Sequence, residues 1–339
     1  MPEPAPIAAA PPAAPAADTV AAVPAAPTAP SAAPPAAASG PTAAIAYAGI
    51  GDEAGPDLAT QLAALDTLGW RHLELRSVGG TAVADLDDTA FARVAGELSA
   101  RGVVVCCVDS RIGNWARPVT GDPGPDLAEL AVLADRCAAL GTDRVRVMSY
   151  PNDGLPEHEW RRRVLDRTRR LCDLAERRGL RLLVENCAGW AADSAERMLD
   201  LLDSVASPAL GLLFDTGNGI AHGYSAADLL GDIAARVAHV HVKDARSTPQ
   251  GTVYTVPGQG EARVADCLRM LLAAGYQGVW SIEPHLALRP HEPGTALSGD
   301  PAGFTAAGEA LRRLVDRVVV PAAPGWSGGA VGLVRRGAP

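Results

Sequence analysis

From residue 44 onward, short apolar runs alternate with longer stretches of helical periodicity. Eight apolar runs predict β-strands, at 44–50, 72–77, 103–110, 144–150, 181–186, 211–216, 238–244 and 279–284. The stretches between them are rich in Ala, Leu, Arg and Glu, and Gly69, Gly102 and Gly141 stand where three helices should end. Strands that alternate with helices predict βαβ units and a parallel sheet. Eight such units predict the α/β class and one closed (β/α)₈ barrel.

Both ends of the chain lack this pattern. Residues 1–42 are almost wholly Ala and Pro, which predicts a disordered arm because there is little to bury and proline interrupts helices. The arm has no basic segment followed by a sustained apolar one, so a secretory signal is not expected. Residues 321–339 predict a short flexible tail. The barrel domain is therefore expected to span 43–320.

Composition and charge narrow the class of partner. The chain is 48% hydrophobic and 20% charged, as globular proteins are, and its net charge of −9 argues against a nucleic-acid partner. No apolar run reaches the ~18–20 residues of a membrane helix. The six cysteines show neither a CxxC motif nor a disulfide framework. We expect a cytoplasmic protein with a small-molecule substrate and no membrane partner, and the sequence leaves a homo-oligomer open.

Polar residues stand at the ends of the last four predicted strands. Glu185, Asp215, His241 and Glu283 would project from strands five to eight, and in such barrels the chemistry lies at the carboxyl ends of the strands. Three converging carboxylates repel one another unless a cation lies between them. The pattern therefore predicts one divalent metal ion on these four ligands. The donor set suits Mn²⁺, our preferred ion, and also Mg²⁺, Co²⁺ or Zn²⁺.

The seventh strand, "AHVHVKDA", places His239, His241 and Lys243 on one face. His241 stands at the strand end as the candidate ligand, and His239 lies one pleat deeper, where it would fill the interior or orient a ligand. A single strand histidine is usually structural. Three acidic strand ends in adjacent units favour the ligand interpretation over helix caps and loop starts.

These residues lie in motifs that resemble a known family. "HLELRS", "VENCAGW", "LLFDTGN", "HVHVKDA", "PGQGE" and "SIEPH", within residues 44–319, are similar to those of the sugar phosphate isomerase/epimerases, which are xylose isomerase-like TIM barrels and include inosose dehydratase-like enzymes. The resemblance implies the same four metal ligands, with Glu185 and Glu283 as the catalytic acid/base pair. Many members carry a histidine three residues after the aspartate. Asn218 stands there in this chain, so the sugar specificity does not transfer.

The chemistry that fits is proton abstraction next to a carbonyl, through a metal-stabilised enediolate. We expect a sugar or keto-sugar isomerase or epimerase. Loss of a β leaving group on the same site would make it a dehydratase or lyase of a keto-sugar or inosose. A non-catalytic sugar-binding barrel is the alternative from another class. A DNA-repair endonuclease of the same superfamily is disfavoured, because no histidine ends the third or fourth strand.

Other polar and aromatic residues are expected around the metal. The predicted substrate contacts are Glu74, Asn218, Lys243 and Arg246. Arg146 is expected to pair with Glu74 inside the barrel, and Trp115 and Trp190 are candidates for the pocket wall. The glycine-containing segment "VPGQGEA" is expected to be either a lid over the site or a plain turn.

Overall fold

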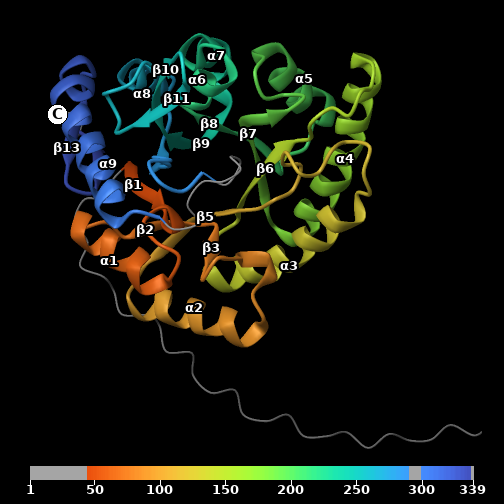
Figure 1. The fold of residues 1–339 in the computed structure, drawn as a ribbon, viewed down its shortest axis with the longest axis horizontal. Helices are drawn as coiled ribbons and strands as arrows, with labels where there is room; N and C mark the ends of the chain where they lie inside the picture. Colours follow the sequence, from red (N-terminus) through yellow and green to blue (C-terminus); the bar gives the residue numbers. More distant parts are fainter. Residues whose placement is uncertain (1–43, 290–298, 337–339) are drawn as a thin grey trace, which may run out of the picture. The chain divides into compact units, whose positions relative to one another are not determined.

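The computed structural model describes residues 44–289 and 299–336, so the predicted arm at 1–42 lies outside the described residues. Its main sheet is a closed barrel of eight parallel strands, in which β12 pairs with β1 and completes the ring (Figure 1). The strands are β1 (Ile45–Ile50), β2 (His72–Leu75), β5 (Val104–Asp109), β6 (Arg144–Ser149), β7 (Arg181–Gly189), β8 (Leu210–Asp215), β9 (Val237–Val242) and β12 (Gly278–Ile282). The predicted barrel and its eight strands are confirmed.

Helices flank the barrel on the outside (Figure 1). They are α1 (Leu58–Leu68), α2 (Asp88–Ala100), α3 (Gly124–Leu140), α4 (Glu157–Arg178), α5 (Ala195–Val205), α6 (Asn218–His222), α7 (Ala226–Ile233), α8 (Val264–Ala273) and α9 (Pro301–Leu314). Side chains cap several of them: the Asp57 carboxylate, for example, accepts a hydrogen bond from the Thr60 N–H at the start of α1. Gly69 and Gly141 end α1 and α3 with a positive φ.

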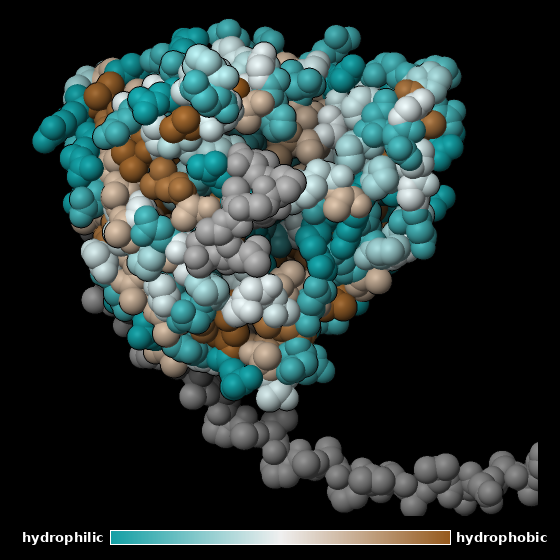
Figure 2. All heavy atoms as spheres, in the orientation of Figure 1, coloured by the Kyte–Doolittle hydropathy of each residue, from teal (hydrophilic) through white to brown (hydrophobic). Residues whose placement is uncertain are grey.

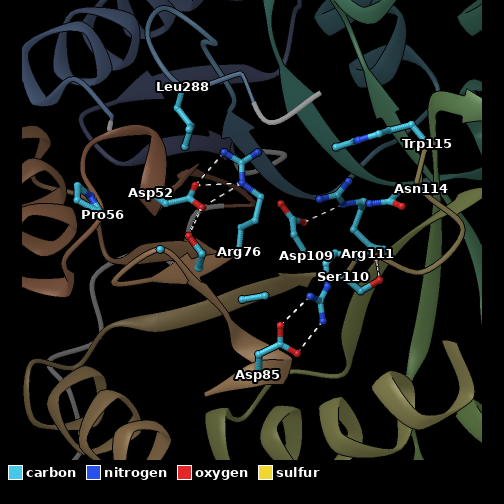
Figure 3. A pocket seen from close by; sticks show the side chains of 14 residues that line it. Asp52, Pro56, Arg76, Asp85, Asp109, Ser110, Arg111, Asn114, Trp115 and Leu288 are labelled. Atoms are coloured by element: carbon cyan, nitrogen blue, oxygen red, sulfur yellow. Dashed lines mark hydrogen bonds and ion pairs between the residues drawn. The ribbon is translucent and has the colours of Figure 1, made fainter. Parts of the chain in front are cut away.

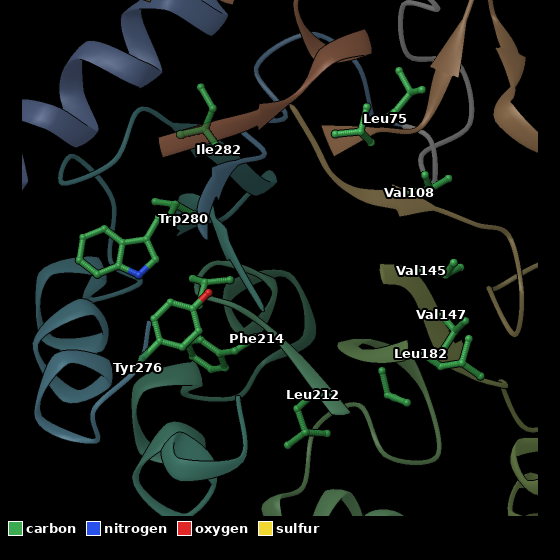
Figure 4. Close-up of a cluster of buried hydrophobic side chains, with 14 of the residues drawn as sticks. Leu75, Val108, Val145, Val147, Leu182, Leu212, Phe214, Tyr276, Trp280 and Ile282 are labelled. Carbon is green, nitrogen blue, oxygen red and sulfur yellow. The ribbon is translucent and has the colours of Figure 1, made fainter. Parts of the chain in front are cut away.

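The hydrophobic core lies between the strands and the surrounding helices. Tyr47, Phe214 and Trp280 on the strands are fully buried in it, together with helix residues such as Leu62 and Leu65, and Figure 4 shows part of this cluster. Strands covered on both sides carry nearly continuous apolar runs, which is why the sequence located them well. On the face drawn in Figure 2, hydrophobic residues appear in small groups among hydrophilic ones. Within the described ranges, no helix is long and apolar enough to cross a membrane.

Two hairpins extend the carboxyl ends of β2 and β9. The first pairs β3 (Ser77–Val78) with β4 (Thr81–Ala82), and the second pairs β10 (Asp244–Thr248) with β11 (Gly251–Thr255). The buried Asp244 carboxylate accepts hydrogen bonds from four backbone N–H groups, those of Ala245, Gly258, Gly260 and Ala262, at 2.8–3.1 Å. The segment predicted as a lid or a turn is therefore tied to the end of β9 in this structure.

The predicted flexible tail at 321–339 is wrong for most of its length. β13 (Trp326–Gly329) and β14 (Gly332–Arg335) form an antiparallel hairpin, and β14 pairs with β1. Trp326 and Leu333 are buried. At Gly332, β14 approaches β1 so closely that a Cβ atom on this residue would lie 1.9 Å from the Ile45 carbonyl oxygen. Glycine-rich strands with few large apolar residues resemble loops in sequence, which explains the error.

Candidate metal centre

Four side chains from neighbouring strands converge at the mouth of the barrel. Glu185 lies on β7, Asp215 ends β8, His241 lies on β9, and Glu283 directly follows β12. One ligand atom of each lies within 4.8 Å of the others, and all four residues are buried. His241 Nδ1 is 3.6 Å from Glu185 Oε1 and 3.5 Å from Glu283 Oε2. The structure thus brings together the residues that the strand-end pattern singled out.

The buried atoms at the centre test whether this group suits a metal ion. Asp215 Oδ2 and Glu283 Oε2 are inaccessible to solvent and face only the Lys243 ammonium, at 3.0 and 2.5 Å, while the buried His241 Nδ1 makes no hydrogen bond. One ammonium offsets one of the three carboxylate charges, and a buried polar atom without a partner costs about 1–3 kcal/mol. Carboxylate oxygens with one imidazole nitrogen are donors that divalent ions such as Mn²⁺, Mg²⁺ and Zn²⁺ accept. The residues therefore fit a divalent ion.

Glu74, inside the barrel, orients the imidazole of His241. It is completely buried on β2, and its two oxygens lie 3.0 Å from His239 Nε2 and 3.0 Å from His241 Nε2. Burial raises the pKa of Glu74, but the two histidines outweigh burial and hold this pKa well below its usual value. Because Nε2 of His241 is engaged by Glu74, Nδ1 is the nitrogen that faces the three carboxylates.

The carboxylates are held by donors on their outer sides. Asp215 Oδ1 accepts the backbone N–H groups of Gly217 and Asn218, each at 2.7 Å, which turns Oδ2 toward the centre. Glu185 Oε2 accepts a hydrogen bond from Arg146 at 3.3 Å. Glu283 Oε1 accepts one from Arg76 at 3.0 Å. Each acid thus has one oxygen held by a donor on its outer side, and its other oxygen is directed toward the centre.

Lys243 brings a positive charge directly into this group. Its ammonium nitrogen is 2.5 Å from Glu283 Oε2 and 3.0 Å from Asp215 Oδ2, and it donates a hydrogen bond to Asn218 Oδ1 at 3.0 Å. Burial lowers the pKa of Lys243, but the surrounding carboxylates raise it further, so the pKa lies well above the usual value and the group stays protonated. Asn218 also donates to Glu185 Oε1 at 3.0 Å.

The other predicted site residues lie in different places. Glu74 contacts two histidines beneath the centre and has no exposed surface, so it lies where a substrate does not reach. Two cavities, of about 470 and 30 Å³, lie at the barrel mouth. Arg246 is exposed on β10 and lines neither of them. Trp190 is buried and donates its indole N–H to Glu157, whereas Trp115 does line the mouth.

The predicted pair between Arg146 and Glu74 is wrong. Arg146 contacts Asp109 at 3.4 Å and Glu185 at 3.3 Å instead. Both oxygens of Glu74 are occupied by the histidines of β9. Burial raises the pKa of Asp109 to about 7 despite the neighbouring Arg146.

Sequence reasoning missed a second layer of residues around Glu283. Arg76 follows β2 and binds Asp52, Glu53 and Glu283 at 2.8–3.0 Å. Glu53 also accepts hydrogen bonds from the backbone N–H and from Nδ1 of His285, at 2.9 and 2.8 Å. The available signals were the arginine in "LELRS", the acidic pair after the first strand, and the histidine in "SIEPH".

Known proteins resemble this chain in sequence. Over 142 residues the chain is 28% identical to inosose dehydratase of Geobacillus thermodenitrificans, an alignment that covers 38% of this chain and 47% of that protein. The chain thus spans about half the length of the curated relatives it matches.

Solved structures share the fold at lower identity. The crystal structure of the IOLI protein with a bound zinc atom has a TM-score of 0.64 at 16% identity and covers 81% of this chain and 99% of that one. D-psicose 3-epimerase from Clostridium cellulolyticum H10, with D-tagatose, has a TM-score of 0.62 at 16% identity, with coverage of 81% and 99%. The xylose isomerase-like TIM barrel family model matches residues 62–308. The chain belongs to the xylose isomerase-like TIM barrel family.

Proposed function

We propose that the protein is a divalent-metal-dependent isomerase or epimerase of a sugar or keto-sugar. The observation that carries this proposal is the buried group of Glu185, Asp215, His241 and Glu283, whose ligand atoms lie within 4.8 Å of one another. Family membership and the epimerase among the structural relatives support it. Manganese is our proposed ion, and the cytoplasm is our proposed compartment.

The reaction begins with removal of a proton from the carbon next to a carbonyl group. A divalent ion held by these four residues would polarise that carbonyl and make the neighbouring C–H more acidic. Glu185 and Glu283 come from strands on either side of β8 and β9, and each has one oxygen directed toward the centre. One glutamate takes the proton, and the other returns a proton to the opposite face or to the adjacent carbon.

The basic residues keep the two glutamates in place for this step. Arg146 and Arg76 hold the outer oxygens of Glu185 and Glu283. The buried Lys243 ammonium, 2.5 Å from Glu283, supplies a donor that can also hold a substrate oxygen. Burial of the whole group excludes bulk water, which strengthens each of these electrostatic contacts.

A dehydratase is the second candidate. The similarity to inosose dehydratase favours it. The same proton abstraction then leads to loss of a hydroxyl group from the next carbon, and the glutamate that would return a proton to carbon protonates the departing oxygen instead.

The test is incorporation of solvent deuterium. The manganese-loaded full chain is incubated in D₂O with keto-sugars and inososes, and substrate and product are followed by mass spectrometry. An isomerase or epimerase gives deuterium on carbon without loss of water, and a dehydratase gives a product 18 mass units lighter before exchange is counted. Absence of exchange and of product across the panel would reject both enzymes in favour of a non-catalytic sugar-binding barrel.

A further inference from the structure

A cavity of about 470 Å³ lies beside the metal centre (Figure 3). Its lining residues come from the ends of β1, β2, β5 and β6 and the segments that follow them, together with Leu288 after β12. The metal candidates come from the other half of the ring, β7, β8, β9 and β12. The volume falls in the range of roughly 300–1,000 Å³ that pockets for drug-sized ligands have, which exceeds what a few reacting atoms require.

The large cavity shares lining residues with a small space beside the metal candidates. A second cavity of about 30 Å³ lies against Glu185, Lys243 and Glu283, and Arg76, Trp115 and Arg146 line both cavities. A space of this size holds a few atoms and is far smaller than the cavities that bind whole ligands. A substrate whose reacting atoms lie against Glu185 and Glu283 therefore extends into the large cavity.

The large cavity carries balanced charge. Arg76 is paired with Asp52 at 2.8 Å, and Arg146 with Asp109 at 3.4 Å. Arg111 makes two hydrogen bonds of 2.7 Å to Asp85. Because each arginine in the lining already faces a carboxylate, no surplus positive charge is left for a phosphate or carboxylate group. The cavity suits a polar but uncharged ligand.

Asp109 offers this ligand an acceptor. Its side chain is buried, yet neither carboxylate oxygen accepts a hydrogen bond. In Figure 3 the side chain lies between Asp52 and Trp115 in the middle of the lining. A buried carboxylate without a hydrogen-bond donor is costly, and the hydroxyl group of a ligand would supply one.

Trp115 offers an apolar face at the rim. Its side chain is 41% exposed, which is unusual for so large an aromatic residue, and it lines the cavity with the apolar Leu288 and Pro56. A sugar ring has an apolar C–H face and a rim of hydroxyl groups. Such a ring matches an aromatic face next to an unsatisfied carboxylate.

We propose that the large cavity binds a second, uncharged sugar ring attached to the reacting sugar, so that the substrate is a keto-sugar glycoside of disaccharide size. That the first sugar reacts at the metal centre rests on the function proposed above. The ring in the large cavity would lie against Trp115 and donate a hydroxyl hydrogen to Asp109.

The first test measures binding without turnover. Glucose, trehalose, cellobiose and sucrose are titrated into the manganese-loaded full chain by calorimetry. We expect at least one disaccharide to bind about tenfold more tightly than glucose. Trp115→Ala should remove most of this preference, and Trp115→Phe, which keeps an aromatic face, should retain most of it. Equal affinity for glucose and all three disaccharides would overturn the inference.

A steric variant and a kinetic readout complete the test. Ala82→Phe places a ring in the large cavity and should reduce the preference for disaccharides, whereas a preference unaltered by both Ala82→Phe and Trp115→Ala would overturn the assignment. Deuterium exchange with 3-ketoglucose and 3-ketotrehalose tests the reaction separately. Exchange without preference for 3-ketotrehalose rejects the second ring alone. Preferential binding without any exchange supports the subsite and rejects the enzyme.

Discussion

The two halves of the barrel mouth use acidic residues in opposite ways. In the half formed by β7, β8, β9 and β12, three carboxylates and His241 converge around the single ammonium of Lys243. In the half formed by β1, β2, β5 and β6, Asp52 and Asp85 are each paired with an arginine around an open cavity. Three carboxylates that share the single Lys243 ammonium keep surplus negative charge, which suits a cation. Carboxylates that are each paired with an arginine suit a neutral polar molecule instead. In the functions proposed above, the first half would be the reaction centre and the second half the recognition surface.

The largest expected effect is the loss of deuterium exchange when a proposed acid/base residue is changed. Glu185→Gln or Glu283→Gln should lower the rate of deuterium exchange by about 10²–10⁴-fold, because each substitution removes a proton acceptor at the reacting carbon. Mass spectrometry of the substrate measures the rate. Glu196→Gln, which changes an exposed glutamate on α5, is the matched control and should leave it unaltered. A rate within threefold of the unmodified protein for both active-site variants would assign the acid/base work elsewhere.

Metal removal tests whether the converging half depends on a cation. Loading the chelated protein with Mn²⁺ at about one hundred times its Kd should stabilise it by about 2.7 kcal/mol, which calorimetric scanning detects as a rise in Tm. Asp215→Asn should abolish this rise because it replaces an anionic donor at the centre. A rise that survives in Asp215→Asn would mean that the ion binds at another place.

Glu74 connects the two halves, since it belongs to β2 and contacts the histidines of β9. Glu74→Gln should weaken Mn²⁺ binding by about 10–100-fold, because the amide no longer fixes the His241 ring as a carboxylate does. Isothermal titration measures the affinity. An unchanged Kd would show that His241 is held by packing alone.

The smallest effect concerns the recognition half and its pH dependence. The pKa of Asp109 is about 7 in the folded protein, above its ordinary value of 3.8. The unfolded chain therefore releases this proton first, and the resulting destabilisation grows as the pH rises from about 4 to 7. Asp109→Asn should stabilise the metal-free protein by about 1 kcal/mol or more at pH 8 and by much less at pH 4. Denaturant unfolding at both pH values measures this. A loss of stability at pH 8 would mean that the pair with Arg146 outweighs burial.

Sequence patterns predicted the barrel, and they placed the four metal candidates at strand ends, for a physical reason. Strands buried on both faces are nearly continuous apolar runs, and each metal candidate stands at the end of such a run, as Asp215 does in "LLFDT". No comparable pattern marks the recognition half. Arg76 and Glu283 are 207 positions apart in the chain and meet only because the ring closes between β12 and β1. A register shift between Leu73 and Glu74 helps to determine where Glu74 points, and sequence periodicity does not reveal it.

The Asp244 carboxylate has a consequence for how such a protein can diversify. Its four hydrogen bonds join the residue after it, Ala245, to Gly258, Gly260 and Ala262. The hairpin of β10 and β11 therefore begins and ends at the same carboxylate, which lies three residues after His241 in the chain. Insertions or deletions at its tip would change the outer surface without displacing the imidazole. The tip of this hairpin, between Thr248 and Gly251, could therefore vary in length while its base, where the buried Tyr254 packs on His285, stays in place.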